Sequence, residues 1–564
     1  MFLPTTKKEC LKLGWQQLDV ILVTGDTYID SPHIGIAVIG KMLVKAGYRV
    51  GIIAQPEIND GSDITRLGEP ALFWGVTAGS VDSMVANRTA SGKRRKSDDY
   101  TPGGVNDRRP DRATIVYSNL IRHYYKDTVP IVLGGIEASL RRIAHYDFWS
   151  NKIRRSILFD AKANYLLYGM AEKAVLGLAK CLKENKSPHH VRGVCYISDS
   201  IPENCIEIPS FQETRKSMAS FTKMFHVFYR NNDPLTASAL AQKQDSRYLV
   251  QNPPPPYLSS EELDDVFNLE FENDVHPYYR KQGKVKALDT IQFSISTHRG
   301  CYGECNFCAI AVHEGRTVRW RSKSSILNEA RRMTRHPHFK GVISDVGGPT
   351  ANMYGFECNV KMKKGCCPDK RCLFPQICPN LPVDHSKQID VLSSIRKLAD
   401  VKKVFVASGI RHDMVLHDQR HGMHYLRDVV KHHVSGQMKI APEHSEYRVL
   451  KFMGKPDTKS LLRFKELFYK FTKELKKEQY LTYYFIAAHP GCTDRDMQKL
   501  HTFVTTKLGL IPEQVQLFTP TPSTYATLMY YTQRDPFTGK PIFVERDPAR
   551  RNRQKTIIRK KRNM

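Results

Sequence analysis

Three cysteines stand on one short loop, Cys301-Tyr-Gly-Glu-Cys305-Asn-Phe-Cys308, close behind the apolar run TIQFSIS at 290–296. The run predicts a strand, so the thiols lie on a loop at the end of that strand. Three thiolates on so short a loop can hold three irons of a cubane and leave the fourth iron without a protein ligand. The spacing therefore predicts an iron–sulfur cluster with one open iron, held by Cys301, Cys305 and Cys308.

A zinc ion is the alternative occupant of this loop. Zinc usually takes four ligands and favours paired Cys-x-x-Cys knuckles, and His313 is the residue that offers a fourth ligand here. The strand before the loop, the aromatic Phe307 before its last cysteine and the five β/α units after it favour the cluster instead.

Apolar runs alternate with amphipathic helical segments from about Asp289 onward. The helical segments, such as SILNEARRMTRH and SLLRFKELFYKFTKELKKE, carry apolar residues at three- and four-residue spacing. The apolar runs are TIQFSIS, GVISDVGG, VKKVFVASG, SGQMKIAP, LTYYFIAAHPG and QVQLFTPTP. Six β/α units predict a (β/α)6 partial TIM barrel over residues 285–534, with its chemistry at the C-terminal ends of the strands.

The amino-terminal part of the chain shows a similar alternation. The apolar runs are LDVILVTG at 18–25, YRVGIIAQ at 48–55, PALFWGV at 70–76, TIVYS at 114–118, TVPIVLGG at 128–135 and ANYLLYGM at 163–170, with a helix expected over His33 to Ala46. Such alternation is typical of a parallel, doubly wound sheet. We therefore expect a Rossmann-like α/β domain over residues 1–250.

Four segments interrupt or follow these two series. Residues 87–113 are rich in Arg, Lys, Gly, Asp and Pro and predict a surface loop, in which Lys93, Arg94, Arg95 and Lys96 either grip a phosphate or are simply solvated. The prolines of QNPPPPYL stiffen an extended segment, so residues 251–284 are expected to be a linker. A Cys-rich insertion covers 354–384, and 535–564 is a basic tail expected to be disordered by itself.

The composition limits the classes of protein to which this chain can belong. The chain has 564 residues, 41% of them hydrophobic and 25% charged, which is enough for two or three domains. It contains no apolar stretch of membrane-spanning length and no secretory signal, so a cytoplasmic protein is expected. The net charge of +29 makes nucleic acid a candidate partner, with a solvated basic surface as the alternative.

The cysteine loop and the β/α series after it resemble the radical SAM superfamily, where SAM is S-adenosylmethionine. In that superfamily a Cys-x-x-x-Cys-x-x-Cys loop holds a [4Fe–4S] cluster whose open iron chelates the amino and carboxylate groups of SAM. An electron from a donor cleaves SAM to methionine and a 5′-deoxyadenosyl radical, which abstracts a substrate hydrogen. The resemblance implies an enzyme with SAM and an electron donor as its partners.

The same resemblance implies SAM contacts at the strand ends. Gly347 and Gly348 stand where the superfamily's glycines bind the SAM amino group, although Pro349 replaces the usual acidic residue. The other implied contacts are Phe307 in the cysteine loop, Ser408 and Arg411 after the third strand, Glu443 after the fourth and His489 after the fifth. For the strand-end side chains, a structural hydrogen bond at the barrel rim is the alternative role.

Motifs over almost the whole chain resemble the YgiQ-type radical SAM family. They include RGCYGECNFCAIAVHEGR, QNPPPP, SDVGGPTANMYG, VASGIRHDM, KIAPEH, FIAAHPG and the segment from Cys358 to Cys378. This resemblance supports the fold and the cofactor, and it implies no particular substrate.

A second group of cysteines lies in the insertion, where no core is expected to hold them. Cys358, Cys367, Cys372 and Cys378 are the preferred ligands of a zinc ion or an auxiliary cluster, with Cys366 interchangeable with its neighbour Cys367. Disulfides or unliganded thiols are the alternative.

The amino-terminal domain resembles the later part of the cobalamin-binding domain that precedes many radical SAM barrels. The expected signature of the axial histidine is Asp-x-His-x-x-Gly, whereas this chain has Asp30-Ser-Pro-His33-Ile-Gly35. Cobalamin is therefore the less favoured cofactor, and a scaffold or substrate-binding module is preferred.

The leading hypothesis is a radical SAM enzyme of unknown substrate. An RNA-modifying enzyme is one alternative, because CNFCAIAVHEGR and RWRSKSSILNE are similar to the cluster region of tRNA methylthiotransferases. Those enzymes carry three further cysteines in an amino-terminal domain, a pattern that Cys10, Cys181, Cys195 and Cys205 do not reproduce. A non-catalytic, metal-stabilised RNA-binding protein is the alternative from another class.

Overall fold

The computed structural model describes residues 1–560 and divides into two compact units. The first unit comprises residues 1–257 and 265–292, and the second comprises residues 258–264 and those from 293 onward. The first unit thus extends past the boundary expected near residue 250, because most of the predicted linker packs within it. Each unit is a mixed α/β body with its own hydrophobic core.

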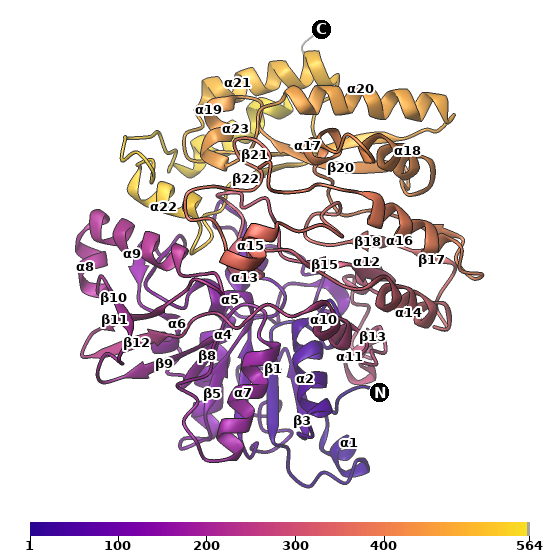
Figure 1. The fold of residues 1–564 in the computed structure, drawn as a ribbon. Coiled ribbons are helices and arrows are strands. Elements are labelled where there is room, and N and C mark those ends of the chain that lie inside the picture. The colour runs from indigo at the N-terminus through magenta and orange to yellow at the C-terminus, as the bar shows by residue number, and fades with distance from the viewer. Residues whose placement is uncertain (561–564) are drawn as a thin grey trace. The chain divides into compact units, whose positions relative to one another are not determined.

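A nine-stranded sheet forms the centre of the first unit (Figure 1). Its strands are β1 (Val20–Thr24), β3 (Val50–Ala54), β4 (Phe73–Thr77), β5 (Ile131–Leu133), β8 (Tyr165–Leu167), β9 (Val194–Ser198), β10 (Cys205–Ile208), β11 (Ala239–Gln244) and β12 (Arg247–Gln251). They lie in the order β10-β11-β12-β9-β8-β5-β4-β1-β3, and the five from β3 to β8 are mutually parallel. All five residues of β1 are buried, as expected of a parallel strand covered on both faces.

Short hairpins and helices complete the first unit. The paired short strands are β2 (Ile29–Asp30) with β13 (Asp274–Val275), and β6 (His145–Asp147) with β7 (Lys152–Arg154). The helices are α1 (Lys7–Lys12), α2 (Gly35–Lys45), α3 (Ser83–Asn87), α4 (Ala113–Tyr124), α5 (Gly135–Leu140), α6 (Ile157–Asp160), α7 (Glu172–Lys183), α8 (Phe211–Lys216), α9 (Met218–Arg230), α11 (Pro277–Arg280) and α12 (Leu288–Ile291). Helix α10 (Ser260–Phe267) follows the proline run.

Five of the six apolar runs expected in this part contain sheet strands, and the sixth is a correction. The run TIVYS at 114–118 belongs to helix α4 rather than to a strand. Thr114, Tyr117, Ser118 and Ile121 are buried at helical spacing, so the apolar residues form one face of a helix. An apolar run this short does not by itself distinguish a strand from a buried helix.

The strand order reverses between β1 and β4, which is the place where open α/β sheets bind ligands. In this chain a buried ion network occupies that place. Arg109 is fully buried and donates to the Gly25 carbonyl at 3.0 Å and to Asp26 at 2.6 Å, with Asp98 at 3.1 Å. One residue of the expected surface loop 87–113, Arg109, is therefore buried. Residues Lys93 to Lys96 of the same loop are exposed, as predicted.

Six parallel strand positions follow one another through the second unit. The strands are β14 (Ser294–Ser296), β17 (Val342–Ile343) continued by β18 (Asp345–Gly347), β19 (Lys403–Val404), β20 (Gln437–Glu443), β21 (Tyr480–Ala487) and β22 (Val515–Leu517). Each pairs in parallel with the next along the chain, the third and fourth through Ile410 and Ile440. Every apolar run predicted for this part contains one of these strands.

Amphipathic helices connect and cover these strands. They are α13 (Ile310–His313), α14 (Lys323–Thr334), α15 (Asn359–Lys364), α16 (Ser386–Arg396), α17 (His412–His417), α18 (Gly422–His432), α19 (Tyr447–Met453), α20 (Lys459–Glu474), α21 (Asp494–Phe503), α22 (Tyr525–Thr532) and α23 (Pro548–Arg559), and β15 (His298–Arg299) forms a short hairpin with β16 (Arg319–Trp320). Helix residues such as Ile326, Leu392 and Phe464 pack in one core with the strand residues Ile343 and Ile440.

The basic carboxyl-terminal segment is folded up to residue 560, which corrects the expectation of disorder. Helix α23 packs against α21, and its Ile558 is fully buried. Gln554 accepts a hydrogen bond from the Ala488 amide at 3.0 Å and donates to the Cys492 carbonyl at 3.2 Å. Arg551, Gln554 and Ile558 recur at helical spacing, so one buried face stands among the exposed basic residues. Residues 561–564 of the predicted tail lie outside the described residues.

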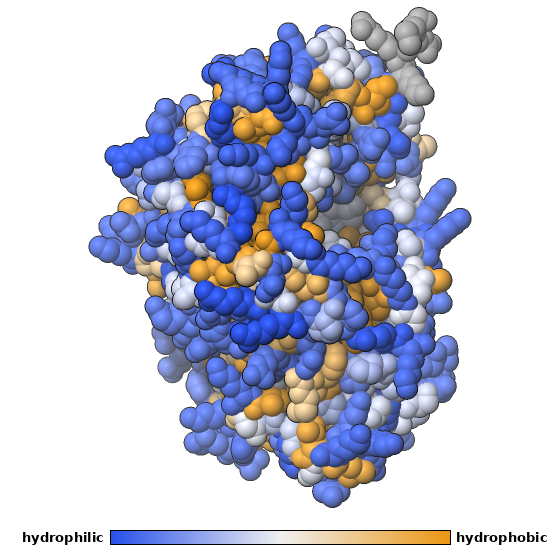
Figure 2. Space-filling model, turned by 90° about the vertical axis from the view of Figure 1, so that its right-hand side faces the viewer, coloured by the Kyte–Doolittle hydropathy of each residue, from blue (hydrophilic) through white to orange (hydrophobic). Residues whose placement is uncertain are grey.

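One face of the molecule is covered mostly by hydrophilic residues, with smaller hydrophobic areas between them (Figure 2). In residues 1–560 no helix combines the length and the apolar character needed to cross a lipid bilayer.

Candidate cluster and cofactor site

The cysteine loop begins where the chain leaves the β15 strand. Gly300 has a φ of 81°, and a Cβ there would lie 2.4 Å from the Thr317 carbonyl oxygen, so only glycine fits. The Gly300 amide donates to the buried Glu314 carboxylate at 3.0 Å. The Cys301 sulfur then accepts a hydrogen bond from the Gly303 amide at 3.3 Å and lies 3.5 Å from the Thr350 hydroxyl. These turns and hydrogen bonds thus fix the start of the loop.

Two of the three sulfurs converge on Gly303. A Cβ built on Gly303 would lie 3.2 Å from the Cys301 sulfur and 3.7 Å from the Cys305 sulfur. Burial raises the pKa of the Cys301 thiol and of the Cys308 thiol, so these thiols keep their protons until a metal displaces them. The loop is therefore a compact, half-buried set of potential thiolate ligands.

The distances between the cysteine sulfurs do not match those around a single zinc ion. In residues 1–560 no three cysteine sulfurs lie within 4.8 Å of one another, and His313 at the end of α13 completes no such group. Around tetrahedral zinc with Zn–S bonds of about 2.3 Å, the sulfurs would be only about 3.8 Å apart. The arrangement fits a multi-iron cluster better than one ion.

Arg411 brings a positive charge to the thiols. Its Nη1 atom lies 3.6 Å from the position of a Cβ on Gly303, the point that both sulfurs approach. Asp413 pairs with Arg411, whose Nε donates to it at 2.8 Å, and both residues are buried. Burial lowers the pKa of Arg411, but the pairing with Asp413 outweighs it, so the guanidinium stays charged.

The two glycines after β18 are required by close packing. A Cβ on Gly347 would lie 3.1 Å from the Ser408 side chain, and one on Gly348 would lie 2.6 Å from the His298 ring. The Gly347 carbonyl already accepts hydrogen bonds from the Thr297 amide at 2.7 Å and from its hydroxyl at 3.0 Å. Gly347 therefore has a structural role of its own.

Ser408 points toward Asp345. Its hydroxyl donates to the Asp345 carboxylate, which also accepts from the amides of Ala407 at 2.8 Å and Ser408 at 3.1 Å. The Ser408 hydroxyl thus donates its proton to Asp345, and only the lone pairs of the hydroxyl oxygen remain available to a ligand.

Glu443 ends β20 in a left-handed conformation, with φ of 68°, just after a register shift in the strand. The side chain is buried, and its carboxylate lies 3.9 Å from the Lys455 ammonium, which also donates to the Ala441 carbonyl at 2.7 Å. Burial raises the pKa of Glu443, although Lys455 and Arg411 lower it in part. A strained, buried carboxylate at a strand end is a typical functional feature.

His489 follows β21 and stacks edge-on with the cysteine loop. Its ring centroid lies 6.2 Å from that of Phe307 and 5.0 Å from that of Phe518. Burial lowers the pKa of His489 to about 4, so the imidazole is neutral near pH 7. Nδ1 lies 2.9 Å from the Pro490 carbonyl, whereas Nε2 is buried without a hydrogen-bond partner among the described residues.

The second cysteine group also comes together. One pocket is lined by Cys358, Cys366, Cys367, Cys372 and Cys378, and none of them is disulfide-bonded. Metal binding by this group, with disulfides or unliganded thiols as the alternative, stays a prediction.

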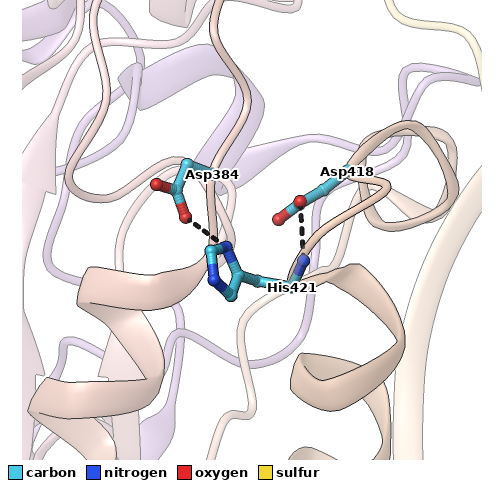
Figure 3. A group of neighbouring side chains, drawn as sticks. All are labelled: Asp384, Asp418 and His421. Carbon is cyan, nitrogen blue, oxygen red and sulfur yellow. Dashed lines mark hydrogen bonds and ion pairs between the residues drawn. The ribbon is translucent and has the colours of Figure 1, made fainter.

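Asp384, Asp418 and His421 form a further group close enough for a metal ion (Figure 3). Asp418 is already saturated, because Oδ2 accepts from the His385 amide at 2.9 Å and lies 2.8 Å from its ring. Oδ1 accepts from the amides of Arg420 at 3.1 Å and His421 at 2.9 Å. Asp418 thus joins two chain segments, and we interpret the group as structural.

Known proteins match this chain over nearly its whole length. Residues 2–294 match the family described as Radical SAM N-terminal, and residues 513–563 match a domain of unknown function, DUF3362. A UPF0313 protein of Fusobacterium nucleatum is 55% identical over 562 residues, which cover 100% of this chain and 99% of the relative. A UPF0313 protein of Thermotoga maritima is 50% identical, with coverage of 99% and 98%. The chain belongs to the UPF0313 family.

Solved structures similar to this UPF0313 chain are radical SAM enzymes. TsrM of Kitasatospora setae, a radical SAM methyltransferase solved with tryptophan and a SAM analogue, has a TM-score of 0.50 at 12% identity, covering 90% of this chain and 75% of TsrM. The cobalamin-dependent radical SAM enzyme OxsB has a TM-score of 0.52 at 14% identity, covering 93% and 57%. At such identities the likeness establishes the fold alone.

The predicted membership of the radical SAM superfamily is confirmed by the family match, and this UPF0313 chain is a radical SAM-type enzyme. The names of its relatives give no substrate. The finer YgiQ-type resemblance stays a prediction.

Several residues of this UPF0313 site were not predicted from the sequence. They are Thr350 beside Cys301, Asp413 paired with Arg411, Lys455 beside Glu443 and Asp345 beneath Ser408. Asp413 follows Arg411 by two residues in RHDM, a spacing that signals a local ion pair. Lys455 and Thr350 lie in separate loops, and no local pattern points to them.

Proposed function

We propose that this chain binds a [4Fe–4S] cluster through Cys301, Cys305 and Cys308 and uses it with SAM as a radical enzyme. The observation that carries the proposal is the convergence of the Cys301 and Cys305 sulfurs on Gly303, with the charged Arg411 beside them. When bound, the cluster and SAM supply reductive cleavage of SAM to methionine and a 5′-deoxyadenosyl radical.

The chain's own residues would orient SAM against the cluster. Arg411 is a fixed cation suited to a carboxylate, because Asp413 holds its guanidinium on one side. Glu443, at the end of β20, would accept hydrogen bonds from hydroxyl groups of SAM. Its carboxylate lies near the charged Lys455 ammonium. Phe307 and the neutral His489 form an aromatic wall, and Nε2 of His489 has no partner within the described chain.

The glycine segment has a more indirect role in this proposal. Gly347 and Gly348 allow Ser408 and His298 to pack against the end of β18, which keeps bulky side chains away from the thiols. The Ser408 oxygen can still accept a hydrogen bond while its proton is held by Asp345.

The finer architecture belongs to the same proposal. We infer that the second unit is a (β/α)6 partial TIM barrel, since six strands follow in sequence order with helices between them. The strand order of β3, β1, β4, β5 and β8 supports a Rossmann-like first unit.

Cobalamin is bound in the OxsB structure, and the corresponding question for this chain is whether its strand-end residues fit a corrin. The strand-end position between β1 and β4 is filled by Arg109 and its partners Asp26 and Asp98, all buried. These charged pairs do not fit a corrin ligand, and no step is derived through one.

An anaerobic SAM-cleavage assay tests the proposal. The protein is reconstituted with iron and sulfide, reduced with dithionite and given SAM, and 5′-deoxyadenosine is quantified. Cys305→Ala should abolish the product, whereas Cys205→Ala, a matched change on strand β10, should not. Equal product from the intact protein and Cys305→Ala would rule the proposal out, whereas no product from either protein would favour the non-catalytic RNA-binding alternative.

A further inference from the structure

The Cys-rich insertion folds into a pocket of its own in the second unit. Helix α15 lies beside α13 in Figure 1, and the Lys361 ammonium of α15 donates to the Arg316 carbonyl that follows α13. Five cysteines line this pocket, together with the basic side chains of Lys361, Lys370 and Arg371 and the acidic side chain of Glu304. Glu304 lies between Cys301 and Cys305, so the pocket backs onto the first cysteine loop.

Backbone turns and hydrogen bonds bring the cysteines of the insertion together. Gly365 ends α15 with a φ of 79° and turns the chain into Cys366, whose sulfur lies 3.7 Å from the Thr317 hydroxyl. The Cys378 amide donates to the Cys372 carbonyl at 2.8 Å, which holds those two residues side by side. Cys358 is buried in a small hydrophobic cluster with Phe356.

The spacing of these sulfurs excludes a closed zinc site in this conformation. In residues 1–560 no three cysteine sulfurs lie mutually within 4.8 Å, whereas four thiolates around zinc are about 3.8 Å apart for Zn–S bonds of about 2.3 Å. Iron–sulfur clusters spread their ligands over several irons, so they accept more widely spaced thiolates in a larger cavity.

Two basic side chains at the pocket offset negative charge. The buried Lys361 ammonium lies 3.4 Å from the Cys372 sulfur, and it interacts electrostatically with Cys366 as well. Arg371 donates to the Glu304 carbonyl at 3.1 Å and to the Asn306 side chain at 2.7 Å, which ties the insertion to the first cysteine loop. Thiolates and sulfide would otherwise leave a buried net negative charge without a partner.

We propose that Cys358, Cys366, Cys372 and Cys378 bind a second iron–sulfur cluster in this pocket. Cys366 replaces Cys367 in the ligand set expected from the sequence, because Cys366 is buried beside Thr317 and Cys367 is partly exposed. Binding replaces four S–H bonds with four S–Fe bonds and releases four protons. Sulfide and both ferrous and ferric iron come from solution, so no further oxidant is needed. Every ligand position is then filled by the protein, unlike the site at Cys301.

The experiment uses a full-length variant without the first site, Cys301→Ala/Cys305→Ala/Cys308→Ala. After anaerobic reconstitution with iron and sulfide, it should retain about two to four irons per chain with equal acid-labile sulfide. Adding Cys366→Ala should remove most of both, whereas adding Cys367→Ala should leave them within about 20%. These counts do not depend on SAM cleavage, so this proposal and the proposed function fail separately.

Three outcomes would overturn the proposal. The first is a triple variant that holds less than one iron and one sulfide per chain. The second is tight uptake of one zinc ion when zinc is offered alone, with no uptake of iron and sulfide. The third is loss of iron in Cys367→Ala but not in Cys366→Ala, which would reject the ligand set. Cys366→Ala with an intact first site should keep the iron of that site, which shows that the unit is folded.

Discussion

Arg411 and Asp413 form a buried ion pair whose guanidinium borders the point that two cluster thiols approach. The pair lies within a single turn at the start of α17, so it is formed locally, before any cofactor is present. Its position makes it both a structural element and a fixed positive charge beside the proposed cluster.

Asp413→Ala should therefore destabilise the protein even without a cofactor. Removing one partner of a buried pair leaves an uncompensated charge, which costs about 3 to 5 kcal/mol. Thermal unfolding of the apo protein measures the loss. The double variant Arg411→Met/Asp413→Leu removes both charges and should recover most of the stability, and an unstable double variant would contradict the argument.

Gly303→Ala should lower the iron content of the first site. The added methyl group would lie 3.2 Å from one sulfur and 3.7 Å from the other, in the space between them. Gly409→Ala is the matched control, because a Cβ there meets nothing within 4 Å. Iron and sulfide counts after reconstitution should fall only in Gly303→Ala, and equal counts in the two variants would contradict the proposed geometry.

Acid should destabilise the second unit through its buried histidines. Burial lowers the pKa of His489 to about 4 and that of His444 to about 3, from 6.5 in the unfolded chain. Because the folded pKa is depressed, the stabilisation is complete above pH 6.5 and is lost as pH falls toward 4. The loss for His489 is about 3 kcal/mol.

Unfolding measured from pH 7 to pH 4 tests this dependence. His444→Gln should flatten the pH dependence of stability, since the amide does not titrate. The exposed His424→Gln on α18 is the control and should leave the dependence as it is. An unchanged slope in His444→Gln would show that another group carries the acid sensitivity.

Helix α23 should stabilise the loop after β21. Gln554→Ala removes the partners of the Ala488 amide and the Cys492 carbonyl, at a cost of about 1 to 3 kcal/mol. Asn552→Ala on the exposed face of the same helix should be close to neutral. Hydrogen exchange of the Ala488 amide should accelerate in the first variant only.

The first unit should not retain cobalamin. Hydroxocobalamin incubated with the protein should separate from it on gel filtration, because Arg109, Asp26 and Asp98 fill the strand-end position. Absorbance of the protein peak measures retention. Stoichiometric cobalamin in that peak would show that this network rearranges on binding.

Much of the architecture was predictable because short periodic patterns encode it. The six strand runs of the second unit were predicted correctly, since an apolar run bounded by amphipathic helices is a strong local signal. TIVYS was assigned to a strand because five residues do not reveal a helical face, which appears only with Leu120 and Ile121. The buried face of α23 was missed because basic residues surround Arg551, Gln554 and Ile558.

The site was predictable to the extent that it is local. Cys301, Cys305 and Cys308 share one loop, so spacing alone identified them, and the structure brings Gly347 against Ser408 and Phe307 against His489. Thr350 and Lys455 reach the site from other loops through tertiary packing, which no spacing records. The SAM contacts themselves stay predictions.

The bond between Gln554 and the loop after β21 also bears on the order of assembly during synthesis. All six parallel strands of the second unit are synthesised before residue 554, so the loop after β21 lacks this hydrogen-bonding partner until the end of synthesis. Under the proposed function, loading of iron and sulfide onto the finished site would follow translation of α23. The timing of synthesis would then separate the folding of the second unit from the loading of the proposed cofactor.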